Sequence, residues 1–242
     1  MHIKALQQAS VIEYPGHIAD VVYVGGCNLR CPYCYNVDLV LRPQELPDLD
    51  QAQVLAGLHK RSNFVDGLVV TGGEPTLQVD LPAFLTTAKN LGLAVKLDTN
   101  GYLPEVLQKC LEASLVDYVA MDVKTSFARY ALAAGVSVEA ERLVRSVSLL
   151  LGSAIDYEFR TTVASDLVDL ADIRAILGVI SGAKRFYLQA FRPGVTVGWG
   201  DAGPERAPAP EVLENMAALA ASKVGVVGIR GLGVQATKVE AT

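Results

Sequence analysis

Three cysteines, Cys27, Cys31 and Cys34, lie within eight residues of each other in the segment GGCNLRCPYCYN, residues 25–36. A loop with this CxxxCxxC spacing can direct three thiolates at one centre, and thiolates are the usual ligands of iron–sulfur clusters. A four-iron cluster held by three thiolates keeps one iron without a protein ligand. That iron can bind and activate a substrate, as the open position of catalytic zinc does.

Zinc is the alternative metal for such a loop. Structural zinc takes four ligands, and no fourth Cys or His lies inside the segment. The fourth cysteine of the chain, Cys110, lies in LPEVLQKCLEAS, which has the pattern of an amphipathic helix. We expect Cys110 to be a small, partly buried structural residue. Without further cysteines, a second cluster is excluded.

The segment CNLRCPYC, with the aromatic Tyr33 directly before its last cysteine, resembles the cluster motif of the radical S-adenosylmethionine (SAM) superfamily. The resemblance implies a [4Fe–4S] cluster whose open iron chelates the amino and carboxylate groups of SAM. Electron transfer from the cluster would cleave SAM into methionine and a 5′-deoxyadenosyl radical. In such an enzyme the cofactor supplies the chemistry, and the protein supplies placement and exclusion of water.

Elements of strand and helix pattern alternate along the chain. Apolar runs predict strands at 18–24, 67–71, 94–98, 117–122, 155–163 and 185–190, with a further candidate at 224–229. Helical patterns lie at 50–62, 81–91, 103–113, 138–151, 168–180 and 210–222. This alternation predicts an α/β fold built from right-handed βαβ units with a parallel sheet. Six strands are too few to close a barrel, so we expect a partial (β/α)6 TIM-like barrel with splayed parallel strands.

The length of 242 residues is compatible with one domain over 1–242, with a core at about 14–194 and a C-terminal extension at 195–242. Residues 192–210 are rich in proline and glycine and contain the only tryptophan, Trp199. Their composition predicts a long loop that serves as a functional lid or is mobile. Trp199 is a candidate anchor for a partner protein, or else packs under its own loop.

Polar residues follow the predicted strands at their C-terminal ends, where the sites of α/β barrels lie. The second strand ends in VVTGGEPT, with Gly72, Gly73 and Glu74. Glycines there let the backbone approach a ligand closely, and a carboxylate or carbonyl can accept from an ammonium group. In the family that the chain resembles, this segment holds the SAM amino group. The third strand ends in KLDTNG, which adds Asp98, Thr99 and Asn100.

Charged residues also close the later strands, in the segments AMDVK, YEFRTTV and LQAFRPG. Asp122 would face Asp98 from the adjacent strand, which suits a bound monovalent cation or the hydroxyls of a ribose. Lys124 and an inward-facing Arg160 would suit the SAM carboxylate, because a buried charge is costly without a partner. Gln189 could reach the adenine or the ribose. The alternatives are a structural salt bridge for Lys124 and a solvated, outward Arg160.

Over residues 3–194 the motifs together resemble the anaerobic ribonucleoside-triphosphate reductase activating protein family. The resemblance implies a glycyl-radical enzyme activating enzyme, which takes a hydrogen from a backbone glycine of a partner enzyme. It also implies a reduced flavodoxin- or ferredoxin-like electron donor. Two departures are Tyr35, where the family often has histidine, and residues 192–210, which do not align. No catalytic residues are expected beyond the cluster and SAM ligands.

Two rival functions remain open at this point. The first is a radical SAM enzyme that acts on a small molecule, such as a 7-carboxy-7-deazaguanine synthase. The second is a non-catalytic, zinc-stabilised binding module. We expect His2, His17 and His59 to be structural or surface residues.

The composition speaks against two kinds of partner. The formal net charge of −5 does not suggest nucleic-acid binding, which usually shows a basic patch. No apolar run approaches the ~18 residues of a membrane span. No signal-peptide pattern follows Met1, so a cytoplasmic location is expected.

Overall fold

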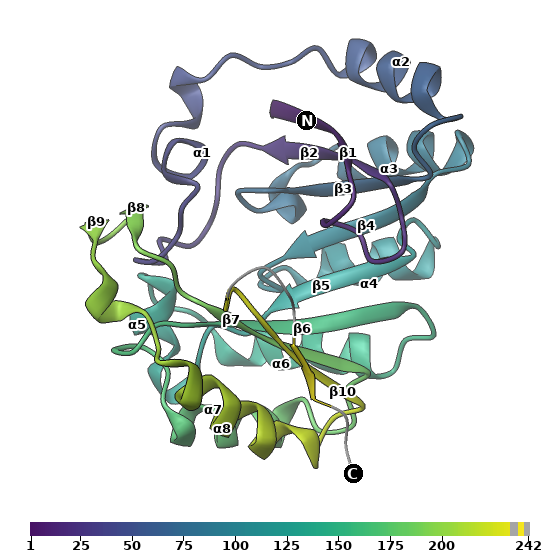
Figure 1. The fold of residues 1–242 in the computed structure, drawn as a ribbon. Coiled ribbons are helices and arrows are strands. Elements are labelled where there is room, and N and C mark those ends of the chain that lie inside the picture. Colours follow the sequence, from purple (N-terminus) through teal and green to yellow (C-terminus); the bar gives the residue numbers. More distant parts are fainter. Residues whose placement is uncertain (233–236, 240–242) are drawn as a thin grey trace. The chain divides into compact units, whose positions relative to one another are not determined.

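The computed structural model of the chain describes residues 1–232 and 237–239. These residues fall into two compact units (Figure 1). The first unit contains residues 1–28, 36–120 and 153–156, and the second contains residues 29–35, 121–152 and the chain from 157 onward. That the whole chain forms a single domain stays a prediction.

The first unit has an N-terminal sheet in which one strand is antiparallel. Strand β1 (Ile3–Ser10) pairs antiparallel with β2 (Ala19–Val24), and β3 (Gly67–Gly72) and β4 (Ala94–Thr99) follow in parallel. The helices of this unit are α1 (Val37–Leu41), α2 (Gln51–Arg61), α3 (Leu81–Asn90) and α4 (Pro104–Glu112), with short 3-10 turns η1 (Pro43–Glu45) and η2 (Pro75–Leu77). Strand β5 (Tyr118–Asp122) begins in the first unit and ends in the second.

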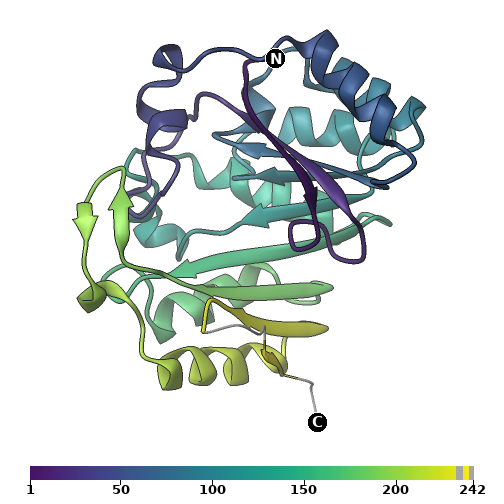
Figure 2. The same ribbon diagram turned by 45° about the horizontal axis from the view of Figure 1, so that its top comes forward.

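Apart from the first residue of β6, the second unit has three parallel strands, β6 (Asp156–Val163), β7 (Arg185–Ala190) and β10 (Val226–Arg230). Strand β11 (Thr237–Val239) pairs antiparallel with β10. The helices are α5 (Tyr130–Ala134), α6 (Ala140–Leu151), α7 (Leu170–Val179) and α8 (Pro210–Ala221), with 3-10 turns η3 (Phe127–Arg129) and η4 (Pro204–Arg206). Helix α8 packs on β7 and β10 and beside α7. A short hairpin, β8 (Gly194–Thr196) and β9 (Gly200–Ala202), follows β7 (Figure 2).

Local sequence explains where several helices begin. Asp50 caps α2 by accepting from the backbone N–H of Gln53, and Asp169 and Asp172 form a reciprocal capping box at the start of α7. Such caps satisfy N–H groups that have no partner inside the helix. Helices α3, α4 and α8 have proline in their first turn, where its missing N–H costs nothing.

The predicted elements are present, and the fold adds several more. All six expected strands and the seventh candidate, β10, are confirmed, as are the six long helices. Helices α1 and α5 are only five residues long and were not predicted from the sequence. The predicted loop at 192–210 was wrong in part, because it contains the β8–β9 hairpin and η4. Among the described residues, no helix is long and apolar enough to cross a membrane.

Candidate functional site

The last two cysteines of the motif lie in a tight turn of the second unit. The backbone N–H of Cys34 donates to the carbonyl of Cys31 over 3.0 Å. Cys31 is only 6% exposed. Burial raises the pKa of its thiol, while the ammonium of Lys124 acts in the opposite direction. A buried thiol facing a cation suits a metal-bound thiolate, because metal binding removes the proton.

Cys27 belongs to the first unit, so the three cysteines are divided between the units. Its sulfur lies 4.0 Å from the side-chain nitrogen of Asn100 and 3.9 Å from the amide oxygen of Asn28. In neither unit do the described residues bring three His, Cys, Asp or Glu side chains together as a metal-binding group. The joint binding of one cluster by Cys27, Cys31 and Cys34 stays a prediction from their spacing.

Tyr33 lies between the two cysteines of the turn and is 5% exposed. Its hydroxyl is buried and has no hydrogen-bond partner of normal geometry in the described chain. The ammonium of Lys124 lies 6.0 Å from the centre of its ring. A buried polar atom without a partner usually marks a missing water, ion or ligand, so Tyr33 fits a residue that faces a bound group.

The glycines of the GGEP segment, residues 72–75, have a structural reason within the first unit. Gly72 has φ +117°, and a Cβ at Gly73 would lie 1.9 Å from the carbonyl oxygen of Gly26. The backbone N–H of Glu74 donates to that same oxygen over 2.8 Å. Only glycine permits this approach. The glycines thus place the GGEP segment directly against the residue before Cys27, in addition to any ligand they admit.

Glu74 is 1% exposed and its carboxylate is held by neutral donors. Oε1 accepts from the backbone N–H of Thr76 over 3.0 Å, from its hydroxyl over 2.6 Å and from the Thr99 hydroxyl over 2.7 Å. Oε2 accepts from the backbone N–H of Asn100 over 2.7 Å. Burial, the largest cause, raises the pKa of Glu74 although these hydrogen bonds lower it. The carboxylate joins the end of β3 to the end of β4.

Asn100 extends this network toward the cysteine motif. Its side-chain nitrogen donates to the amide oxygen of Asn28 over 2.8 Å, and its amide oxygen accepts from the backbone N–H of Tyr102 over 3.0 Å. Both side chains are therefore oriented next to Cys27. Asn100 was predicted from the sequence as a site residue and Asn28 was not, although the position of Asn28 directly after the first cysteine is a usable signal.

Asp98 has a partner, Lys96, that was not predicted from the sequence. The ammonium of Lys96 donates to one oxygen of Asp98, and the hydroxyl of Thr71 lies 3.4 Å from the other. Lys96 is 2% exposed, and a lysine inside the apolar run AVKLD was the available signal. Because side chains two residues apart on a strand share a face, Lys96 and Asp98 point the same way. Asp98 therefore already has a cationic partner before any ligand binds.

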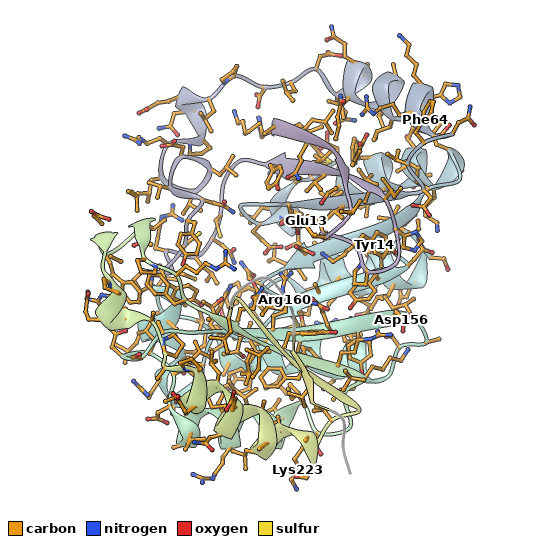
Figure 3. All side chains as sticks on the ribbon, in the orientation of Figure 1. Glu13, Tyr14, Phe64, Asp156, Arg160 and Lys223 are labelled. Carbon is orange, nitrogen blue, oxygen red and sulfur yellow. The ribbon has the colours of Figure 1, made fainter. Side chains whose placement is uncertain are left out.

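Three charged residues of the second unit form one cluster, which we call the charge triad: Asp122, Lys124 and Arg160 (Arg160 is labelled in Figure 3). The Lys124 ammonium donates to Oδ2 of Asp122 over 2.8 Å, and Arg160 Nε donates to Oδ1 over 2.7 Å. Burial acts to raise the pKa of Asp122, but Arg160 and Lys124 outweigh it and hold that pKa well below its usual range. Two cations against one carboxylate leave a net charge of +1, which suits an anionic ligand group.

The outward orientation considered for Arg160 is wrong, since its side chain is only 13% exposed and is paired with Asp122. The structural salt bridge considered for Lys124 is present. Gln189 lies on β7 in register with Thr162 of β6 and Arg230 of β10. In sum, the first unit places Gly72, Gly73, Glu74, Thr99 and Asn100 beside Cys27, and the second places Tyr33 and the charge triad beside Cys31. The SAM contacts assigned to these residues stay predictions.

A model of the "Radical SAM superfamily" matches residues 21–170, more than half of the chain. The chain belongs to this superfamily. A protein of Methanocaldococcus jannaschii named "putative glycyl-radical enzyme activating enzyme" is 31% identical over 196 residues, which cover 79% of this chain and 80% of that protein. The pyruvate formate-lyase-activating enzyme of Streptococcus mutans is 30% identical over 132 residues, half of each chain. The 7-carboxy-7-deazaguanine synthase of Neisseria meningitidis is 34% identical over 113 residues, 47% of each.

Solved structures share the fold at low sequence identity. Streptococcus suis SuiB bound to S-adenosylmethionine matches with a TM-score of 0.64 and 15% identity, covering 86% of this chain and 48% of that one. Coproporphyrinogen III oxidase (HemN) from Escherichia coli, described as a radical SAM enzyme, matches with a TM-score of 0.59 and 12% identity, covering 95% and 66%. The predicted fold class is confirmed.

Membership of the superfamily distinguishes a radical SAM enzyme from the zinc-stabilised binding module. The chain is a radical SAM enzyme related to glycyl-radical enzyme activating enzymes. The superfamily implies a [4Fe–4S] cluster and SAM, so the zinc-stabilised binding module is not supported. Three features fit a cluster and an amino-acid carboxylate: the buried Tyr33 hydroxyl, which has no partner of normal geometry among the described residues, Cys31 beside Lys124, and the net positive charge triad.

Proposed function

We propose that this protein is an activating enzyme that generates a glycyl radical on a partner enzyme, with anaerobic ribonucleoside-triphosphate reductase as the first partner to test. The observation that carries the proposal is the 31% identity that extends over about four fifths of both this chain and the M. jannaschii protein. A reduced flavodoxin- or ferredoxin-like protein is the proposed electron donor. We propose a cytoplasmic location.

Each part of the site has a proposed task. Cys27, Cys31 and Cys34 would hold the cluster, which when bound supplies the electron that cleaves SAM. The GGEP segment would hold the SAM amino group, with Glu74 acting through the turn that it fixes. The charge triad would hold the SAM carboxylate, because its net charge is positive. The remaining polar residues at the strand ends, Asp98, Thr99, Asn100 and Gln189, would contact the adenosine part.

The monovalent cation expected near Asp98 and Asp122 stays a prediction. Asp98 is already paired with Lys96, and Asp122 with both Lys124 and Arg160. These side chains neutralise the two carboxylates, so we expect any such cation to bind weakly. SAM binding by the reconstituted protein should therefore change little between sodium, potassium and choline buffers.

A small-molecule radical SAM enzyme is the second candidate, favoured by the 34% identity to the N. meningitidis 7-carboxy-7-deazaguanine synthase. That match covers less than half of either chain, whereas the activating-enzyme match covers about four fifths. The two candidates differ in what they need besides SAM and a reductant: a partner protein or a small substrate.

Electron paramagnetic resonance tests the proposal. The protein is reconstituted with iron and sulfide without oxygen, reduced, and mixed with SAM and the anaerobic reductase. We expect a glycyl-radical signal with the wild type and with Cys110→Ala, which lies in the fully buried face of α4, and none with Cys31→Ala. No signal with any glycyl-radical partner, while SAM is cleaved in the presence of a small substrate, would favour the second candidate.

A further inference from the structure

The segment after β7 folds back onto the turn that holds the last two cysteines of the motif. We call residues 191–206 the strap; they contain the β8–β9 hairpin and η4 (Figure 2). The backbone N–H of Val197 donates to the carbonyl of Cys34 over 3.0 Å, and that of Gly198 donates to the carbonyl of Pro32 over 3.1 Å. The tip of the hairpin therefore pairs with the backbone on either side of Tyr33.

The contact is close enough to require glycine at one position. A Cβ on Gly198 would lie 2.7 Å from the Cα of Pro32 and 2.8 Å from its Cβ. Real Cβ atoms do not approach other carbons this closely, so any side chain at 198 would push the strap away from the turn. The φ angle of Gly198 is not positive, which makes this approach, and not backbone strain, the reason for glycine.

The ring of Trp199 packs against neighbouring side chains and so stabilises the position of the hairpin. The indole lies edge-on to Phe191, with ring centres 5.4 Å apart, and 6.3 Å from the ring of Tyr33. The guanidinium of Arg206 covers the indole at 4.1 Å from the ring centre. Aromatic pairs and cation–π contacts of this kind stabilise the position of a ring. Trp199 is thus packed within the second unit, as one of the two alternatives for it predicted.

Both ends of the strap are fixed as well. Tyr35 stacks on Phe191 with ring centres 5.8 Å apart, and its hydroxyl accepts from the backbone N–H of Arg192 over 2.8 Å. At the other end, Arg206 pairs with Asp166. Tyr35 is one of the two departures from the family motif. Here a tyrosine, directly after the third cysteine, ties that cysteine to the start of the strap.

We propose that the strap positions the Cys31–Cys34 turn, with Gly198, Trp199 and Arg206 as positioning residues. Its hydrogen bonds fix the carbonyls of Pro32 and Cys34, and its aromatic cover keeps water from that side of the turn. The turn is then ordered before a metal binds, so less conformational entropy is lost on binding. The inference rests on the proposed function only in that Cys31 and Cys34 are taken as cluster ligands.

The test measures how fast Cys31 is alkylated by N-ethylmaleimide in the metal-free protein, by mass spectrometry of the peptides. Gly198→Ala is compared with Gly178→Ala, a glycine of α7 in the same unit with no atom within 4 Å of an added Cβ. Cys110, which is 0% exposed in α4, reports on global unfolding in the same sample. We expect N-ethylmaleimide to alkylate Cys31 roughly tenfold faster in Gly198→Ala than in the wild type. Local opening of the turn becomes easier by about that factor when one or two hydrogen bonds to the strap are lost. The rate of Cys31 alkylation in Gly178→Ala should equal that of the wild type, and the rate of Cys110 alkylation should be the same in both variants and the wild type.

Trp199→Ala and Trp199→Phe provide a second comparison. We expect Trp199→Ala to expose Cys31 to a similar degree and the aromatic Trp199→Phe to restore most of the protection. In reconstituted protein, Trp199→Ala should also lose its iron to a chelator several-fold faster than Trp199→Phe. The rate of iron loss reports on the Cys31–Cys34 turn. A residue with only a general structural role would not change that rate selectively.

Wild-type rates of Cys31 alkylation in both Gly198→Ala and Trp199→Ala, with Cys110 protected, would overturn the proposal. If Gly198→Ala also exposes Cys110, the comparison of Trp199→Ala with Trp199→Phe takes its place. Equal rates of Cys31 alkylation in these two variants would then overturn the proposal. Because the alkylation rates are measured without metal, they test the strap even if the proposed cluster is not bound. Iron uptake by the wild type tests the cluster site separately.

Discussion

Two buried carboxylates of this protein, Glu74 in the first unit and Asp122 in the second, are satisfied in opposite ways. Glu74 accepts four hydrogen bonds from neutral groups, and no cation faces it among the donors that the structure describes. Asp122 is held between two cations, Lys124 and Arg160. The first arrangement fixes the shape of a turn, whereas the second leaves an excess positive charge, for which we propose a ligand carboxylate as partner.

Removing the charge of Asp122 should have the largest effect. In Asp122→Asn, two largely buried cations lose the carboxylate that they share, and breaking a buried ion pair costs about 3–5 kcal/mol. We expect the free energy of unfolding of the metal-free protein, measured with urea, to fall by about 3 kcal/mol, since Asp122 is 27% exposed on its side chain. A change under about 0.5 kcal/mol would mean that the triad does not hold the fold.

Removing one cation of the triad should affect the ligand more than the fold. Arg160→Met leaves Asp122 paired with Lys124 but removes the excess positive charge. We expect reconstituted protein to bind SAM about 2–4 kcal/mol more weakly by calorimetric titration, as for the loss of one charged contact. Arg142→Met, on the exposed side of α6, is the matched control. Unchanged SAM affinity in Arg160→Met would remove the triad from the binding site.

Breaking the neutral network should affect stability moderately and SAM only indirectly. Glu74→Gln turns one acceptor into a donor that faces the N–H of Asn100 or the hydroxyls of Thr76 and Thr99. Leaving a buried group unsatisfied costs about 1–3 kcal/mol. We expect that loss in urea unfolding, with a smaller change in SAM affinity than in Arg160→Met. A larger loss of affinity than in Arg160→Met would reverse the roles assigned to the two carboxylates.

The smallest expected effect concerns pH: the contributions of Asp122 and Glu74 to stability should depend on pH in opposite directions. The pKa of Asp122 is depressed below its ordinary 3.8, so its contribution to stability is present above that pH and is lost as the pH falls through the folded value. The pKa of Glu74 is raised above 4.5, so its burial disfavours the fold at neutral pH, and stability from this group increases as the pH falls through its raised value.

Urea unfolding of Asp122→Asn and Glu74→Gln across this acidic range separates the two contributions. Relative to the wild type, Asp122→Asn should lose less stability on acidification. Glu74→Gln should lack the gain that Glu74 gives as it takes up its proton. The same pH profile in both variants and the wild type would show that neither carboxylate has the pKa shift described.

The sequence predicted the elements and the strand-end residues because both depend on local patterns. Apolar runs and caps are read from neighbouring residues, and the C-terminal ends of parallel strands collect polar side chains wherever the fold places them. The partners of these side chains were harder to predict. Lys96 pairs with Asp98 on the same strand, but only the burial of that face shows that the lysine points inward.

The strap could not be predicted because its meaning depends on distant contacts. Proline and glycine in residues 192–210 indicated a loop, whereas the fold needs Gly198 in order to approach Pro32, more than 160 residues earlier. Likewise, the glycines before Glu74 indicated ligand access, but in the fold Gly72 lies against the backbone of Val24 and Gly73 against that of Gly26. Sequence patterns identify a glycine that would permit a close approach, and only the packing shows which group approaches it.

Hydrogen transfer tests the central claim, a glycyl-radical activating enzyme, most directly. The reconstituted, reduced protein is given unlabelled SAM and an anaerobic ribonucleoside-triphosphate reductase deuterated at glycine. The account predicts deuterium in 5′-deoxyadenosine, dependent on the reductase and absent with Cys31→Ala. Deuterium drawn instead from a labelled small metabolite, with no partner protein present, would contradict it.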